Sequence, residues 1–277
     1  MPELPEAEVL KRGLQKAVVG RTITGVTVSK KEVINVPPST YKAMVEGAKI
    51  IAARRAGKAT LLDLDNGNTL VIHLALGGRV VLDDPANYEQ SELPLVYALD
   101  DGSHLVATKF MLANIHVLPT DRLNQDSRLK GLGRDALADL PTVEELGAML
   151  KGSRSAVKTF LMDQTILAGI GNMYANEILF AARLHPEAIA KSLSKGQVER
   201  LHAAIRDVLH QAIKQGGSSE SPFTDVHGKA GKAHAKAKVM WREGERCYEC
   251  GSTIKMIRQA SRATYFCPKC QPAKGRR

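Results

Sequence analysis

Hydrophobic and polar positions along the first 118 residues predict one helix followed by a mostly antiparallel β domain. Apolar side chains share one face between residues 7 and 18, while lysine and arginine fall elsewhere, which is typical of an amphipathic helix. Residues 22–28 then alternate with a period of two, as expected of a strand. Further apolar runs flank Asn-Gly at 66–67 and Asp-Gly at 101–102, dipeptides that favour tight hairpin turns.

The pattern changes in the second half of the chain. Residues 119–142 are polar and interrupted by glycine and proline, which indicates a linker between domains. Helical periodicity follows, over 143–150, 156–162, 173–184 and 197–213. Residues 216–238 are rich in glycine, serine, histidine and lysine, and a segment of that length is expected to be mobile or functional. The predicted parts are therefore 1–118, the linker 119–142, a helical domain 143–238, and a cysteine module with a basic tail, 239–277.

Charge narrows the partners of this chain. Its 277 residues carry a net charge of +10, which predicts attraction to nucleic acid or to an acidic membrane surface. No apolar run approaches the ~20 residues of a membrane-spanning helix, and glutamates stand where a signal peptide has basic residues. We therefore expect a cytoplasmic protein, and in that compartment four cysteines favour metal over disulfides.

The cysteine spacing predicts one structural zinc ion. Two Cys-x2-Cys pairs are separated by sixteen residues, a spacing typical of a four-thiolate zinc site on two turns. Four thiolates leave no open position for water, so this zinc would stabilise the fold instead of taking part in a reaction. The ligands would be Cys247, Cys250, Cys267 and Cys270.

The first six residues, Met-Pro-Glu-Leu-Pro-Glu, contain a candidate nucleophile. If the methionine is trimmed, Pro2 presents a secondary amine whose pKa lies near ~8, and such an amine can attack an electrophilic carbon such as a sugar C1′. Glu3 is its neighbour and a candidate proton shuttle. A plainer interpretation is that Pro5 and Glu6 simply open a helix.

Three further features suit a nucleic-acid phosphate. The Gly169-Ile170-Gly171-Asn172 turn lies between two predicted helices, where backbone N–H groups can face an anion, although Asn172 also fits an ordinary helix cap. Lys58 precedes a strand and has the alternative of being a plain surface lysine. Arg262 belongs to a basic hairpin between the cysteine pairs, which is suited to phosphate contacts or simply solvated.

In the order and spacing of these motifs, the chain resembles the family of formamidopyrimidine-DNA glycosylase and endonuclease VIII. Its Pro-Glu-Leu-Pro-Glu start is similar to that of the formamidopyrimidine-DNA glycosylase branch. The resemblance covers essentially the whole chain. It implies an α+β multidomain fold, with an N-terminal β-sandwich and flanking helices, then a helix–two-turn–helix domain and a zinc finger. It also implies binding of damaged DNA by a monomer associated with the nucleoid.

The resemblance also implies the chemistry. A damaged base is flipped out of the duplex, the Pro2 amine displaces it, and the iminium that forms allows β- and δ-elimination of the strand. In this scheme Glu3 is the proton donor at the sugar, and Lys58 is a general acid/base and phosphate contact. Gly171, Asn172 and Arg262 match the phosphate clamp.

Three segments depart from the family pattern. The wedge segment is His73-Leu-Ala-Leu-Gly-Gly78, in which Leu76 remains an apolar wedge. In the second wedge loop, Phe110 takes the place of the usual arginine and Leu112 that of the usual phenylalanine. The lesion loop has Gly-Lys-Ala-His at 231–234 instead of Gly-Tyr-Phe. We therefore expect retained amine chemistry with altered lesion choice.

Two other hypotheses remain open at this stage. The first is a non-catalytic DNA-damage-binding protein that keeps the same fold. The second is a zinc-ribbon transcription factor, which would show a base-sequence preference that no recognition-helix pattern supports here.

Overall fold

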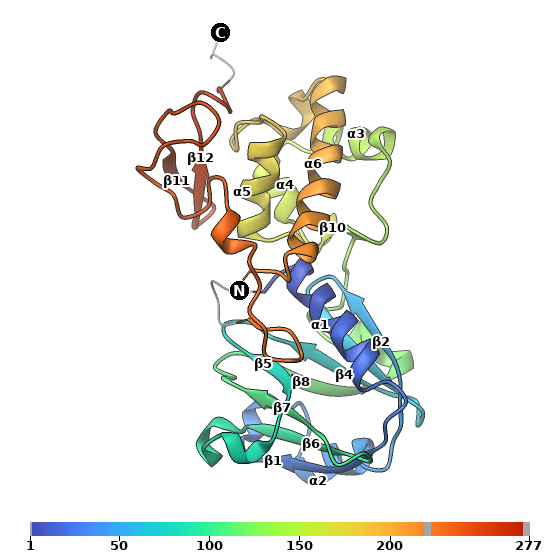
Figure 1. Cartoon of the computed structure of the whole chain (residues 1–277). Helices are drawn as coiled ribbons and strands as arrows, with labels where there is room; N and C mark the ends of the chain where they lie inside the picture. The colour runs from blue at the N-terminus through green and yellow to red at the C-terminus, as the bar shows by residue number, and fades with distance from the viewer. Residues whose placement is uncertain (1, 219–222, 274–277) are drawn as a thin grey trace. The chain divides into compact units, whose positions relative to one another are not determined.

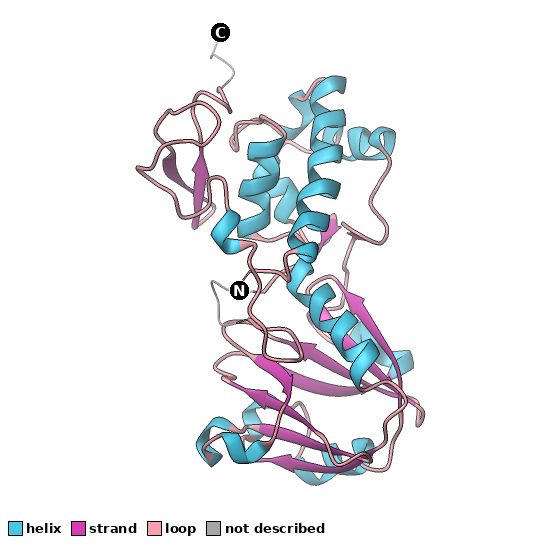
Figure 2. Ribbon diagram, viewed as in Figure 1, coloured by secondary structure: helices cyan, strands magenta, loops and turns pink. Residues whose placement is uncertain are grey.

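The computed structural model describes residues 2–218 and 223–273. The chain divides into two compact units, Met1–Lys130 with Ala212–His234, and Gly131–Gln211 with Ala235–Arg277. Figure 2 shows that strands dominate the first unit and helices the second. Residues 219–222 of the predicted lesion loop and 274–277 of the basic tail lie outside the described residues.

Two four-stranded antiparallel sheets form the first unit (Figure 1). One sheet has the order β2-β3-β4-β8, and its strands are Ile50–Ala56, Ala59–Leu64, Asn68–His73 and Asn114–Pro119. The other has the order β1-β6-β7-β5, and its strands are Ile23–Val28, Leu95–Leu99, His104–Thr108 and Arg79–Leu82. The expected turns close the β3–β4 and β6–β7 hairpins, with Leu62 opposite Leu70 and Val96 opposite Val106.

The core of this unit lies between the two sheets. Alternate residues of both, such as Leu62, Ile72 and Leu105, are buried in one cluster, as the period-two pattern predicts. The predicted β-sandwich is therefore confirmed. Inside it the hydroxyl groups of Tyr41 and Tyr97 are 2.6 Å apart, so each of these buried phenols has a hydrogen-bond partner.

Helix α1, Leu4–Ala17, covers strands β2 and β3 (Figure 1). Leu10 and Leu14 on its apolar face are fully buried in the sandwich core. The unit also contains α2 and four 3-10 turns, η1 to η4; their bounds are Pro38–Val45, Lys31–Val33, Pro85–Asn87, Gln90–Glu92 and Thr120–Gln125.

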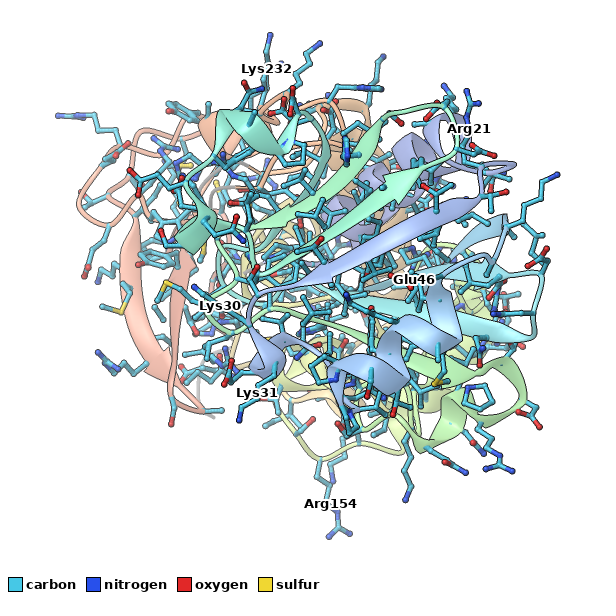
Figure 3. The ribbon with its side chains drawn as sticks, turned by 90° about the horizontal axis from the view of Figure 1, so that it is seen from below. Arg21, Lys30, Lys31, Glu46, Arg154 and Lys232 are labelled. Carbon is cyan, nitrogen blue, oxygen red and sulfur yellow. The ribbon has the colours of Figure 1, made fainter. Side chains whose placement is uncertain are left out.

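The edge of β1 is closed by a side chain. The Glu46 carboxylate accepts a hydrogen bond from the Val26 N–H at 2.8 Å, and Figure 3 shows Glu46 beside this sheet. Arg21, Lys30 and Lys31 of the same unit are exposed and contribute to the positive charge. A charged cap of this kind protects an edge strand from pairing with another chain.

The segment 212–234 packs with the β-sandwich unit, whereas the division made from sequence placed it with the helical domain. Val226 is fully buried in the sandwich core, and its carbonyl accepts the Leu82 N–H of β5 at 2.7 Å. The backbone of Gly231 crosses that of Gly217 so closely that a Cβ on Gly231 would lie 2.1 Å from the Gly217 oxygen. Apolar burial at Val226 and this close crossing thus fix the described parts of the segment after its helix ends.

The second unit consists of four helices, a short parallel strand pair and a hairpin within its described residues. The helices α3 to α6 are Val143–Lys151, Val157–Met162, Asn172–Ala181 and Lys195–Lys214, with a 3-10 turn η5 at Ala190–Ser192. Strands β9 and β10, Arg134–Asp135 and Leu167–Ala168, are paired, and β11 and β12, Lys255–Gln259 and Arg262–Phe266, form the hairpin.

Side chains of α5 join the hairpin to the helices. The Asn176 amide oxygen accepts the Tyr265 N–H at 3.2 Å, and the Glu177 carboxylate accepts three consecutive N–H groups of residues 238–240. None of the helices in the described ranges has the length and apolar character that crossing a bilayer requires.

Candidate active site and nucleic-acid interface

The start of α1 is held by the carboxylate of Glu6. One Glu6 oxygen accepts the Glu3 N–H at 2.7 Å, and the other accepts the Ser218 N–H at 2.7 Å. Pro2 is buried, and the exposures of Glu3 and Glu6 are only 4% and 2%. Glu6 therefore fixes the residue beside the candidate nucleophile, as the third-position glutamate of a capping box whose cap is Glu3.

Lys58 lies in the turn between β2 and β3 and is half-buried. Gly57 before it has φ of 54°, a left-handed conformation that glycine adopts without strain. The turn is a two-residue hairpin connection, so its side chains are placed by the strands on both sides. Pro2, Glu3 and Lys58 thus all belong to the β-sandwich unit, at the start of α1 and at the turn of the two strands that α1 covers.

Two apolar loops follow β4 and β7 in the same unit. Leu76, at the tip of the first loop, is 48% exposed. In the second loop Met111 is 83% exposed and Leu112 is 63% exposed, whereas Phe110 is buried and its ring lies near Gly78 of the first loop. The side chain at the expected arginine position therefore belongs to the core, and the exposed tips are Leu76, Met111 and Leu112.

His73 ends β4 immediately before the first loop. Burial, together with the positive charge of Arg128, lowers the pKa of His73 to about 4. The side chain is thus neutral at neutral pH and can still donate or accept one hydrogen bond.

In the second unit, a buried lysine organises the glycine turn. Lys158 of α4 is 2% exposed, and its Nζ donates to the Asn172 Oδ1 at 2.7 Å, the Ala263 carbonyl at 3.1 Å and the Thr264 Oγ1 at 2.7 Å. Because the amide oxygen of Asn172 accepts from the lysine, the NH2 group is the remaining donor of this half-buried side chain. That donor suits a phosphate oxygen.

Asn172 is the first residue of α5, and the extended Gly171 is the cap, so the cap role considered for Asn172 is wrong. Gln164 holds this turn from inside: its amide donates to the Ile170 carbonyl at 2.8 Å, and its oxygen accepts the Gly169 N–H at 2.9 Å. Gly169 has φ of 106°, which explains the need for glycine there.

Arg262 starts β12 beside the same lysine. A cavity of about 280 Å³ lies between α4 and the hairpin, and Lys158, Asp163, Gln259 and Arg262 are among its lining residues. The structure thus brings Asn172 and Arg262 to one region of the second unit. Lys158 connects them, because its amine bonds both Asn172 and the two residues that follow Arg262. Lys158 belongs to none of the motifs predicted from sequence, although a lysine within the largely apolar run of α4, residues 157–161, is a signal for such a residue.

The four cysteines are gathered as the spacing predicts. Their sulfur atoms all lie within 4.8 Å of one another, and the pairs Cys247–Cys270 and Cys250–Cys267 are 3.9 and 3.4 Å apart. A tetrahedral zinc with Zn–S bonds of about 2.3 Å requires sulfur separations of roughly 3.8 Å. The donor set and its size therefore fit one zinc ion with no open ligand position.

Comparisons with known proteins agree with this geometry. Three family models match the chain: the formamidopyrimidine-DNA glycosylase N-terminal domain over residues 1–110, its H2TH domain over 132–224, and the zinc finger found in FPG and IleRS over 244–273. A formamidopyrimidine-DNA glycosylase of Pelotomaculum thermopropionicum is 38% identical over 99% of this chain and 100% of its own. The chain belongs to the formamidopyrimidine-DNA glycosylase family. One from Chloroflexus aurantiacus is also 38% identical, with 98% of each chain covered.

Solved structures of the family have the same fold. A Lactococcus lactis Fpg in complex with DNA containing an abasic site has a TM-score of 0.89 and 28% identity, covering 98% of this chain and 100% of that one. A variant of that protein, bound to DNA containing Fapy-dG, has a TM-score of 0.89 and 30% identity with the same coverage. The predicted family, fold, zinc finger and class of DNA repair glycosylase are thereby confirmed, whereas the roles of individual site residues stay predictions.

Proposed function

We propose that this protein excises a damaged base, oxidised or ring-opened, from DNA through the Pro2 amine and then cuts the strand as an abasic-site lyase. The observation that carries the proposal is the buried start of α1, where Glu6 fixes the backbone of Glu3 next to Pro2. This bond is also the capping box of α1, so it supports the proposal together with Lys58, which lies at the turn of the two strands that α1 covers.

The proposed reaction begins with the trimmed chain. The Pro2 nitrogen forms a bond to C1′ while the bond from C1′ to the base breaks, and the base leaves with the bonding electrons and takes up a proton. Glu3 supplies a proton at the sugar ring oxygen, which opens the ring and gives the iminium. The iminium acidifies C2′, Lys58 assists proton transfer, and the 3′ and then the 5′ phosphate leave by β- and δ-elimination.

DNA binding is proposed for the second unit, by one copy of the chain at the nucleoid. The Asn172 NH2 group and the Arg262 guanidinium would each contact a phosphate, with Gly171 allowing close approach of the backbone. The zinc finger would hold the hairpin that carries Arg262, and zinc takes no part in any step.

We further propose that lesion choice is altered. The exposed tips Leu76, Met111 and Leu112 present no hydrogen-bonding group to a partner base, so they can fill a gap in the stack without distinguishing one opposite base from another. Lys232, Ala233 and His234 replace the aromatic residues expected over the lesion. The preferred substrates would therefore include ring-opened or bulky purines and abasic sites opposite any base.

Borohydride reduction in the presence of abasic-site duplex tests the function. The enzyme should become covalently attached to DNA at its N-terminus, with rates that differ less than about 10-fold among the four opposite bases. An intact mass before the assay establishes that the chain starts at Pro2. Tight abasic-site binding without attachment would instead support the alternative of a non-catalytic damage-binding protein, which the apolar loop tips alone would also fit.

A further inference from the structure

The turn that carries Lys58 is bonded to α1 on both sides. Before it, the Arg55 guanidinium of β2 donates from Nε to the Glu8 carboxylate at 3.1 Å and from Nη1 to the Gly57 carbonyl at 2.9 Å. After it, the Thr60 hydroxyl donates to the Ala7 carbonyl at 3.1 Å. One side chain therefore connects the first turns of α1 to the peptide immediately before Lys58.

This Glu8–Arg55 pair is buried. The side chains of Glu8 and Arg55 are 8% and 4% exposed, and Glu8 is also paired with Arg12 at 2.7 Å. Burial acts to raise the pKa of Glu8, but hydrogen bonds from Arg12 and Arg55 outweigh it and the pKa is lowered, so the carboxylate is charged. A buried ion pair contributes little net stability compared with apolar packing, so its presence here calls for a role other than stability.

The residue that precedes Arg55 in β2 provides a contrast. Arg54 also forms a two-pronged ion pair, with Asp63 across the β2–β3 ladder, but its side chain is 46% exposed. It bonds no part of the turn or of α1 in the contacts that the structure gives. Two adjacent arginines thus have similar chemistry, and only one is connected to the start of the chain.

We propose that Glu8 and Arg55 are positioning residues for catalysis, which hold the Gly57-Lys58 turn in register with the end of α1 that carries Pro2. The inference rests on the proposed function, in which Lys58 moves protons during elimination. Neither residue touches the substrate. Their effect is to keep the Lys58 amine within the narrow range of positions from which it can act, because small displacements of a catalytic group are costly in rate.

The test uses full-length zinc-loaded protein under single-turnover conditions on an abasic-site duplex. Arg55→Met keeps an unbranched apolar stem and removes the guanidinium, and Glu8 retains Arg12 as a partner, so no charge is orphaned. We expect strand cleavage to slow about 30-fold, with DNA affinity unchanged within about 2-fold. Arg54→Met is the matched control and should cleave at the wild-type rate.

A double-mutant cycle separates positioning from general damage to the fold. If Arg55 acts through Lys58, Arg55→Met should have no further effect on cleavage in a Lys58→Met background. Equal slowing in both backgrounds would overturn the proposal, as would cleavage by Arg55→Met at the wild-type rate. Arg55→Lys, which can reach Glu8 but cannot bond both partners, should recover part of the rate.

The wild-type protein distinguishes failure of this inference from failure of the proposed function. If wild type neither cleaves nor is trapped by borohydride, the proposed function falls first. If wild type is active and the Arg55 variants behave like Arg54→Met, the function stands and only the positioning role is wrong. Should Arg55→Met fold poorly, Glu8→Gln is the second variant. It keeps the shape but removes the charge and one acceptor oxygen, so only one of the two arginine hydrogen bonds can remain, and a smaller slowing is expected if the amide oxygen keeps Arg55.

Discussion

The start of α1 and the pair of loops after β4 and β7 belong to the same β-sandwich unit but are built differently. At the start of α1, Glu3 and Glu6 are almost fully buried and joined by charged hydrogen bonds. At the loops, Met111 and Leu112 are mostly exposed and apolar. The residues expected to make and break covalent bonds are thus held in place, whereas the side chains expected to contact bases carry no hydrogen-bonding group that could distinguish one base from another. A family can keep the first and vary the second without altering the fold.

The largest effect is expected from removing the fixed nucleophile at the start of α1. Pro2→Gly replaces a rigid secondary amine by a flexible primary one, so iminium formation should slow by at least about 1,000-fold. Borohydride trapping on abasic-site duplex measures this rate. DNA affinity, measured separately, should match wild type; weakened binding would show that Pro2 acts as a binding residue.

The buried and exposed members of the second loop should differ in stability. Phe110→Ala removes a buried ring and should lower the free energy of unfolding by about 3 kcal/mol. Met111→Ala, at an 83% exposed position, should change it by less than about 0.5 kcal/mol. Urea unfolding monitored by circular dichroism gives both values. Equal losses would mean that Met111 is packed in solution.

His73 lies at the end of β4, immediately before the first of these loops, and its contribution to stability should depend on pH. Its pKa in the folded state is about 4, below the value near 6.5 in an unfolded chain, so the unfolded state takes up the proton first as pH falls. The contribution of neutral His73 to the free energy of unfolding is therefore complete above pH ~6.5 and decreases towards pH 4. About 2 kcal/mol of it is lost by pH 5. His73→Gln should show a flatter curve of unfolding free energy against pH. Zinc release at low pH affects both proteins alike, so the difference between the curves isolates His73.

In the second unit, Lys158 and Arg262 should differ in salt dependence. Lys158→Met leaves Asn172 free to turn its amide and should weaken DNA binding about 10-fold. Because Lys158 is only 2% exposed, we expect it to touch no phosphate, so the slope of log Kd against log salt should stay the same, whereas Arg262→Ala should lower that slope by about 1. Lys151→Met, at the exposed end of α3, is the control. A reduced slope for Lys158→Met would make it a direct phosphate contact.

Local patterns predicted what depends on neighbours in sequence. Alternation located the hairpins at 66–67 and 101–102, and the cysteine spacing anticipated the sulfur cluster. The first helix was expected from residue 7 but begins at Leu4, because Pro5 occupies a first-turn position where proline is favourable.

Contacts between residues distant in sequence were beyond such patterns. Lys158 bonds Thr264, 106 residues away, and Glu6 bonds Ser218, 212 residues away. In the second loop, comparison with the family pattern placed Phe110 at the position of the usual arginine. The structure buries it instead, next to Lys109, whose φ of 57° changes the direction of the chain at that point. Such a backbone conformation cannot be read from aligned sequences, so the burial of Phe110 could not be predicted.

The return of residues 212–234 to the β-sandwich has a consequence for dissecting this protein. The polypeptide passes between its two units three times, after residues 130, 211 and 234. A fragment ending at residue 130 would lack Val226, leaving an apolar hole beside Gly13 and an unpaired edge on β5. Neither unit can therefore be expressed intact by a single truncation. A gene fusion or circular permutation has to preserve all three connections between the units.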